Sequence, residues 1–233
     1  MDQPDAEPAL GAPGSVVAQR DGDATEDLSE ARSTPALTPQ VVAVVVTHDP
    51  GPWFEEALGS LADQDYPNLS ILVIDAGSVA DPTPRIASVA SRAFVRRLDH
   101  NPGYGAAVNV AMKMVEGASF YLLCHDDVAL ARGATRLLVE EAYRSNAGIV
   151  GPKLVRWDEP GALLQVGMGA DKTGAPSPYV ERGELDQEQH DAVRDVFAVP
   201  GGCFLVRADL FTALGGFDEA ITFHGDDTDL SWP

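Results

Sequence analysis

Residues 41–47, VVAVVVT, form an almost unbroken run of valine, and this run constrains the fold more than any other feature of the chain. A short β-branched segment with no polar face is typical of a strand that is buried on both sides, as in a parallel sheet. Similar strands are predicted at residues 69–75 and 119–124, and segments with apolar residues at helical spacing lie between them. Strands that alternate with helices predict right-handed βαβ units, and therefore an α/β fold with a mostly parallel sheet flanked by helices.

Composition divides the chain into a tail and a folded part. Residues 1–38 are rich in Pro, Ala, Asp, Glu, Ser and Gly and have no apolar period, which predicts a disordered acidic tail. Residues 39–233 are predicted to form one domain, in which regular alternation over 39–150 gives way to a loop-rich half at 151–233. The other predicted elements are helices at 52–64, 83–92, 103–117 and 133–145, strands at 93–98 and 148–155, and a glycine turn, strand and short helix within 196–219.

The charge of the chain limits its partners. The formal net charge is −20, and −14 of it lies beyond the first 40 residues, so the folded part would repel nucleic-acid phosphates. We therefore predict no nucleic-acid partner. No apolar run is long enough for a membrane span and the N-terminus does not resemble a secretory signal. Cys124 and Cys203 are predicted to be buried thiols in a reducing cytosol.

Polar residues follow three of the predicted strands. They are Thr47-His48-Asp49, Asp75 and His125-Asp126-Asp127. In open α/β sheets ligands bind beyond the carboxyl ends of the strands, so this set predicts a site there. Neighbouring carboxylates suit Mg²⁺ or Mn²⁺, which could bridge to a pyrophosphate within an acidic surface. If extended geometry continued past the strand, His125 and Asp127 would point one way and Asp126 the other.

Several stretches together resemble the inverting family 2 glycosyltransferases of the GT-A fold, a Rossmann-like architecture. The resemblance rests on VVAVVVTHDP, ILVIDAGS, NPGYGAAVNVAM, LLCHDDVAL, VPGGCFLVRADLFTALGGFDE and GDDTDL, which occur in the order of the family over residues 41–232. It implies a bacterial enzyme that transfers a sugar from a nucleotide-diphosphate donor to an acceptor hydroxyl. Rhamnosyltransferase-like members build cell-envelope polysaccharides, so the implied acceptor is a polysaccharide, a lipid-linked glycan or another glycan.

The resemblance also implies roles for individual residues. Asp227 corresponds to the general base, with Asp226 in place of the usual Glu. Asp127 corresponds to the metal-binding acid of the DxD motif, and His125 replaces the first Asp of that motif as a weaker candidate ligand of Mg²⁺ or Mn²⁺. The residues implied in nucleotide-sugar binding are Thr47, His48, Asp49, Asp75, Asn101, Gly103, Asn109 and Asp126, with Asp75 at the base. The resemblance further implies that about residues 39–150 form the nucleotide-sugar-binding half of the domain and 151–233 the acceptor-side half, incomplete at the C-terminus.

The chain departs from the family at its end. It stops at DLSWP, where the family usually has a Trp-Arg pair and continues. We therefore expect a C-terminally truncated piece that retains nucleotide binding better than transfer, because Asp227 would lie on a fraying end. The implied location is the cytoplasm, at the inner face of the membrane through segments absent from this chain.

Other interpretations remain open at this point. One is a catalytically inactive nucleotide-sugar-binding module, and another is an interaction protein whose acidic tail binds basic partners. A Rossmann dehydrogenase is disfavoured because THDPGPW stands where G-x-G-x-x-G would follow the first strand. Trp53, Phe54 and Leu58 are predicted to be core residues rather than a sugar platform.

Overall fold

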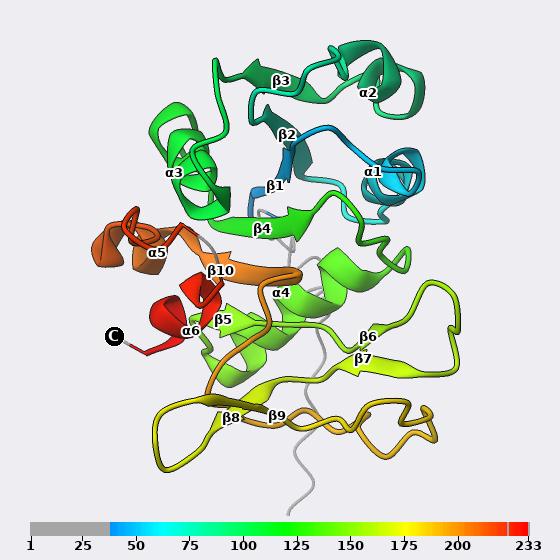
Figure 1. Cartoon of the computed structure of the whole chain (residues 1–233), viewed down its shortest axis with the longest axis vertical. Coiled ribbons are helices and arrows are strands. Elements are labelled where there is room, and N and C mark those ends of the chain that lie inside the picture. The colour runs from blue at the N-terminus through cyan, green and yellow to red at the C-terminus, as the bar shows by residue number, and fades with distance from the viewer. Residues whose placement is uncertain (1–37, 223, 233) are drawn as a thin grey trace, which may run out of the picture. The chain divides into compact units, whose positions relative to one another are not determined.

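The computed structural model describes residues 38–222 and 224–232, so the tail predicted at 1–38 lies almost entirely outside the described residues. Figure 1 labels the elements. The strands are β1 Val41–Thr47, β2 Leu69–Asp75, β3 Phe94–Arg97, β4 Phe120–His125, β5 Ile149–Val150, β6 Leu154–Val155, β7 Leu163–Gln165, β8 Met168–Ala170, β9 Pro176–Pro178 and β10 Cys203–Arg207. The helices are α1 Phe54–Ala62, α2 Thr83–Val89, α3 Tyr104–Met114, α4 Ala134–Ser145, α5 Ala208–Leu214 and α6 Asp226–Ser231.

One six-stranded sheet organises the fold, in the order β3-β2-β1-β4-β10-β5. The first four strands are parallel, and β10 runs antiparallel to both β4 and β5. The register pairs Thr47 with Asp75, Asp75 with Arg97, and Val46 with His125. The predicted α/β class with a mostly parallel sheet is therefore confirmed, and the polar strand ends lie at one edge of the sheet.

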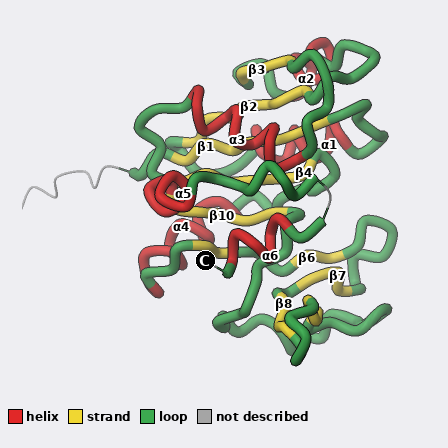
Figure 2. The backbone as a smooth tube through the Cα atoms, turned by 60° about the vertical axis from the view of Figure 1, so that its left-hand side comes forward, coloured by secondary structure: helices red, strands yellow, loops and turns green. Residues whose placement is uncertain are grey.

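Helices cover both faces of the sheet (Figure 2). In β1, Val41, Ala43 and Val45 pack in a cluster with α1, α2 and α4, whereas Val42 and Val44 pack in a second cluster with α3, α5 and α6. This alternation explains why the β1 sequence has no polar face, since side chains on both sides are buried. Cys124 and Cys203 are buried free thiols, as predicted, with their Sγ atoms 3.4 Å apart across β4 and β10.

The helix ends follow from their sequence. α4 ends where Asn146 adopts a left-handed conformation with φ of 53°, and α5 ends at Gly215 with φ of 85°. Glycine and asparagine tolerate this conformation, which stops a helix by turning the chain out of it. Among the described residues, no helix is both long and apolar enough to cross a bilayer.

The loop-rich half differs from the prediction. The strand predicted at 148–155 is divided into β5 and β6 at Gly151-Pro152, because proline lacks the N–H that a continuous ladder requires. Residues 156–194 also contain three short strands that were not predicted, in the hairpins β6–β7 and β8–β9. The division of the domain near residue 150 into donor and acceptor halves stays a prediction.

Candidate active site

The loops after β1 and β2 are joined by hydrogen bonds. His48 Nδ1 donates to the carbonyl of Ala76 at 2.8 Å, and the Asp49 N–H donates to Ser78 Oγ at 2.8 Å. In return, Asp49 Oδ1 accepts from the backbone N–H of Val79 at 2.8 Å. Asp49 has a φ of 50°, a conformation that short polar residues tolerate. The two loops therefore form a fixed polar cradle beyond the ends of β1 and β2.

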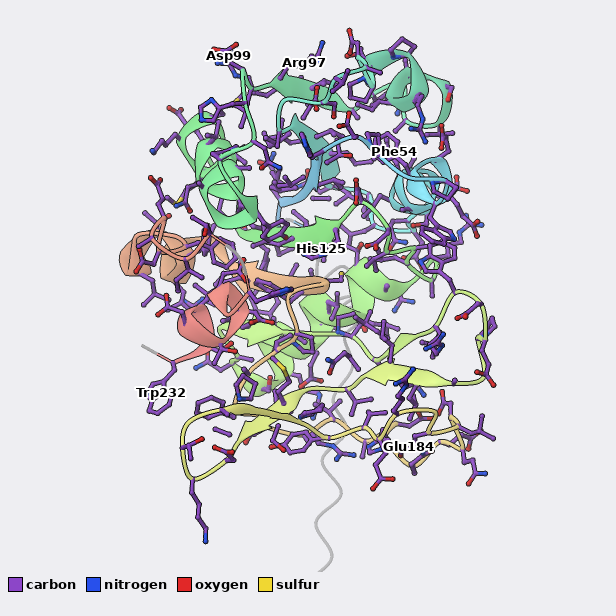
Figure 3. All side chains as sticks on the ribbon, viewed as in Figure 1. Phe54, Arg97, Asp99, His125, Glu184 and Trp232 are labelled. Atoms are coloured by element: carbon purple, nitrogen blue, oxygen red, sulfur yellow. The ribbon has the colours of Figure 1, made fainter. Side chains whose placement is uncertain are left out.

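Asp75 is the buried anchor of this cradle. Its side chain has no exposed surface, and its two oxygens accept hydrogen bonds from the Ser78 N–H at 3.0 Å and from Arg97 Nε at 2.6 Å. Arg97 extends from the end of β3 (Figure 3), where its side chain is 41% exposed and its guanidinium also donates to the Ser78 carbonyl. Asp75 therefore holds the partly exposed Arg97 at the edge of the predicted nucleobase site. Contact between Asp75 and a nucleobase stays a prediction.

We expect Asp75→Ala to destabilise the protein by about 1.5–3 kcal/mol, because it removes a charge-assisted hydrogen bond and leaves the buried Ser78 N–H without its acceptor. Denaturant unfolding measures the change. Asp99→Ala, at an exposed acid just after β3 (Figure 3), is the matched control and should change stability by less than about 0.5 kcal/mol. Equal losses in the two variants would contradict the anchoring role of Asp75.

The His125-Asp126-Asp127 segment leaves the sheet in a turn. β4 ends at His125 and the chain turns at Asp126 and Asp127, so the condition for the expected alternation of these three side chains is not met. Asp126 instead accepts a hydrogen bond from Thr47 Oγ1 at 2.5 Å, across the ends of β4 and β1. Burial raises the pKa of the Asp126 carboxyl and the hydrogen bond from Thr47 opposes that rise. Asp127 and His125 remain exposed.

Asp226 and Asp227 begin α6. Asp227 Oδ2 accepts from the Gly201 N–H at 2.9 Å, and Oδ1 accepts from the Thr228 N–H at 2.7 Å. The carboxylate is thus tied to the glycine turn before β10 rather than left on a loose end. Burial raises the pKa of Asp226, the hydrogen bond from the Asp227 N–H opposes that rise, and the negative charge of Asp227 adds to it.

Tyr104 completes this part of the site. Its ring lies 4.7 Å from the His125 ring, measured between centroids, and its hydroxyl is buried with no hydrogen-bond partner among the described residues. Burial, together with the nearby Cys124 and Asp226, raises the pKa of the phenol well above its usual value. The side chain is therefore a neutral hydrogen-bond donor that bonds to no group in the described part of the chain.

We expect Tyr104→Phe to leave the free energy of unfolding unchanged or to raise it by up to about 1 kcal/mol, because the variant removes a buried hydroxyl without a partner and keeps the ring. Thermal unfolding measures the change, and Tyr121→Phe serves as a second phenol removal from the core. A loss of more than about 1 kcal/mol in Tyr104→Phe would show that the hydroxyl is bonded in the folded protein.

Among the described residues, the possible metal ligands of the site form at most a partial coordination sphere. Within the described ranges, no three His, Cys, Asp or Glu side chains are arranged to hold an ion. Mg²⁺ is commonly held by one or two carboxylates together with substrate phosphates and waters, so a full protein cage is not required. The exposed carboxylate of Asp127 and the adjacent imidazole of His125 fit that kind of partial site.

Other predicted binding residues make structural contacts. Asn101 Oδ1 accepts from the Gly103 N–H at 3.0 Å, in the turn that starts α3. Gly103 has a φ of 94°, and a Cβ atom there would lie 3.2 Å from the Thr222 carbonyl oxygen. Asn109 is 3% exposed and exchanges two hydrogen bonds with the backbone of Phe217. Direct contact of Asn109 with a nucleotide stays a prediction, since its amide already joins α3 to the 217 segment.

Sequence analysis missed several residues at the site. Arg97, Ser78 and Tyr104 were not singled out, and neither was Arg85, whose guanidinium binds Glu55 and the carbonyls of the loop after β1. The position of Arg97 opposite Asp75 depends on the register of a four-residue strand, which the sequence does not show. Only the turn after Asp75 had a local signal, because Asp side chains often accept hydrogen bonds from backbone N–H groups a few residues further on.

The comparisons with known proteins identify the family. The pattern of glycosyl transferase family 2 matches residues 42–215, and the chain belongs to this family. A curated relative, the N-acetylglucosaminyl-diphospho-decaprenol L-rhamnosyltransferase of Mycobacterium tuberculosis, is 31% identical over 222 residues, covering 83% of this chain and 70% of the relative.

Solved structures show the same fold. Staphylococcus aureus TarS 1–349 has a TM-score of 0.61 at 18% identity, covering 83% of this chain and 55% of the 1–349 chain, and its complex with UDP-GlcNAc has a TM-score of 0.57. The mannosyltransferase PcManGT of Pyrobaculum calidifontis, in complex with GDP-Man and Mn²⁺, has a TM-score of 0.57 at 20% identity, covering 84% of this chain and 52% of PcManGT. The chain spans about half the length of these structures.

Proposed function

We propose that the protein transfers a sugar from a nucleotide-diphosphate donor to an acceptor hydroxyl with inversion at the anomeric carbon. The observation that carries the proposal is the convergence of Asp127 and Asp227 at the carboxyl edge of the sheet. Asp127 follows β4, and Asp227 is hydrogen-bonded to the turn before β10, the strand that pairs with β4. A base and a metal-binding acid at neighbouring strand ends suit this reaction, because the acceptor oxygen attacks one face of the sugar while the nucleotide diphosphate leaves from the other face.

The donor lies over the ends of β1, β2 and β4 in this proposal. Asp75 and Arg97 face the base and ribose, and Thr47, His48 and Asp49 border the nucleotide. Asp126 accepts a hydrogen bond from Thr47 and so fixes the start of the Asp127 loop. Asn101, Gly103 and Asn109 act at the start and on the inner face of α3, where they shape the wall of the donor pocket.

Asp127, with His125 as a weaker candidate ligand, would hold Mg²⁺ or Mn²⁺ against the diphosphate. When bound, the ion supplies positive charge to a departing nucleotide diphosphate. The protein offers few other cations here, because Arg85 is paired with Glu55 and Arg97 with Asp75. The Mn²⁺ in the PcManGT complex supports this choice of ion.

Asp227 is the proposed general base. It accepts the proton of the acceptor hydroxyl while that oxygen bonds to the anomeric carbon, and the bond from the anomeric carbon to the diphosphate oxygen breaks. The two backbone N–H groups that bind the Asp227 carboxylate fix its orientation before the acceptor arrives. No covalent enzyme intermediate is required.

The acceptor is proposed to be a glycan of the cell envelope, and a lipid-linked one in particular. The support is the name of the mycobacterial relative, which acts on a diphospho-decaprenol carrier.

A catalytically inactive nucleotide-sugar-binding module is the second candidate. The observation that favours it is that both oxygens of Asp227 already accept backbone hydrogen bonds. Incubation with UDP-, dTDP- and GDP-sugars, Mn²⁺ and a glycan acceptor separates the two, with mass spectrometry for product and calorimetry for nucleotide binding. Glycan product supports the enzyme, whereas metal-dependent binding without product supports the module.

A further inference from the structure

The two indole rings of Trp53 and Trp157 form a stacked pair at the rim of the site. Their ring centroids are 6.4 Å apart and their planes differ by 26°. Trp53 precedes α1 and is 45% exposed, so its predicted place in the core is wrong, whereas Phe54 and Leu58 are each 1% exposed and buried as predicted. As the residue before α1, Trp53 lies outside the buried helix face that Phe54 and Leu58 share.

Hydrogen bonds fix the Trp157 ring and the loop that carries Trp53. Trp157 Nε1 donates a hydrogen bond to the backbone carbonyl of Asp127, which joins the loop after β6 to the proposed metal-binding loop. On the other side, Arg85 donates to the carbonyls of Pro50 and Gly51, both at 2.8 Å, and so fixes the loop that leads to Trp53. The pair is therefore a rigid aromatic surface that is continuous with the site.

The Trp53–Trp157 surface has the chemistry of a site for an uncharged sugar ring. An indole presents a flat apolar face, which matches the C–H face of a pyranose ring, and its stacking contacts cost little conformational entropy. The exposed carboxylates of Asp49, in the loop that leads to Trp53, and of Asp127, whose backbone carbonyl binds Trp157, accept hydrogen bonds from hydroxyl groups and repel anions. An uncharged, polyhydroxylated ring fits this combination, and a phosphate group without a bridging cation does not.

We propose that Trp53 and Trp157 form a sugar-binding platform that stacks a pyranose ring of the glycan acceptor. The acceptor is favoured over the nucleobase because Trp157 belongs to the half of the domain after residue 150, whereas the predicted base position is beside Asp75 and Arg97, beyond β2 and β3. The proposal rests on the proposed function for the identity of the acceptor, and the binding of a free glycan tests it separately.

The test begins with binding. In a Trp232→Phe background only Trp53 and Trp157 remain as tryptophans. Titration with the β1,4-linked disaccharide of N-acetylglucosamine should change tryptophan fluorescence, and Trp53→Ala should weaken the disaccharide affinity by roughly 3- to 10-fold, as expected for one lost stacking contact. Phe94→Ala, at an aromatic residue that is 69% exposed on β3, is the matched control and should bind as the parent does.

Kinetics provide the second measurement. In both Trp53→Ala and Trp157→Phe, the KM for the acceptor should rise. The KM for the donor should stay within about twofold of the parent value, and the midpoint of thermal unfolding within about 2 °C. Unchanged disaccharide affinity in Trp53→Ala would overturn the proposal, and so would a loss confined to UDP affinity, which would assign the rings to the base. If the parent chain makes no product, the proposed function fails, and the fluorescence titration still decides whether the platform exists.

Discussion

Asp227→Asn should reduce the rate of sugar transfer by roughly a hundredfold to ten-thousandfold while leaving donor affinity within about twofold of the parent. Proton transfer by a positioned base contributes a factor of this size, and asparagine cannot accept the proton. Its amide oxygen can still accept one of the backbone hydrogen bonds from Gly201 or Thr228, so the start of α6 should persist. Turnover of labelled donor and calorimetry with the nucleotide diphosphate measure the two quantities.

Substitutions at two acids near Asp227 distinguish the loss of the general base from the loss of any nearby carboxylate. Asp229→Asn, at an exposed position on the same helix, is the control and should retain transfer. Asp226→Asn tests the rival base, because burial raises the pKa of Asp226 toward the range in which a carboxylate is a better base. A larger loss in Asp226→Asn than in Asp227→Asn would move the base to Asp226.

Asp127→Ala should remove the dependence of donor binding on Mn²⁺. With Mn²⁺ present, we expect the parent to bind a nucleotide diphosphate about tenfold to a hundredfold more tightly than in EDTA, since the ion bridges an acidic surface and a negatively charged ligand. In the variant the two conditions should give the same weak affinity. Calorimetry with a panel of nucleotide diphosphates measures the difference.

The control for this effect is Asp63→Ala, which removes an exposed acid after α1 and should keep the Mn²⁺ dependence. Asp75→Ala should lower affinity by a similar factor with and without the ion, because its proposed contact is with the base. Equal affinity of the parent in EDTA and in Mn²⁺ would remove the metal from the account.

The long apolar runs made the sheet predictable. In β1, β2 and β4 the burial of both faces produces a signal that is visible in each strand alone. The strand β9, Pro176–Pro178, has no such signal and exists because it pairs with β8. The helix predicted at 52–64 begins two residues before α1, so the prediction places Trp53 on a buried helix face, whereas the residue is 45% exposed.

The site was predictable to the extent that its residues lie at strand ends. Thr47, Asp75 and His125 meet at one edge because parallel strands end together. The contacts of Arg97 with Asp75 and of Trp157 with Asp127 join segments 22 and 30 residues apart. Such contacts depend on register and on loop paths, which no local pattern encodes.

The most direct measurement of the central claim is the anomeric configuration of the product. Proton NMR of the glycan formed from a donor of known anomeric configuration gives this configuration from the coupling constant of the new anomeric proton. A single displacement assisted by Asp227 predicts inversion at the anomeric carbon, with an α-linked donor giving a β-linked product. Retention of the donor configuration would contradict the account, because it requires either a covalent intermediate or attack from the face that the diphosphate leaves.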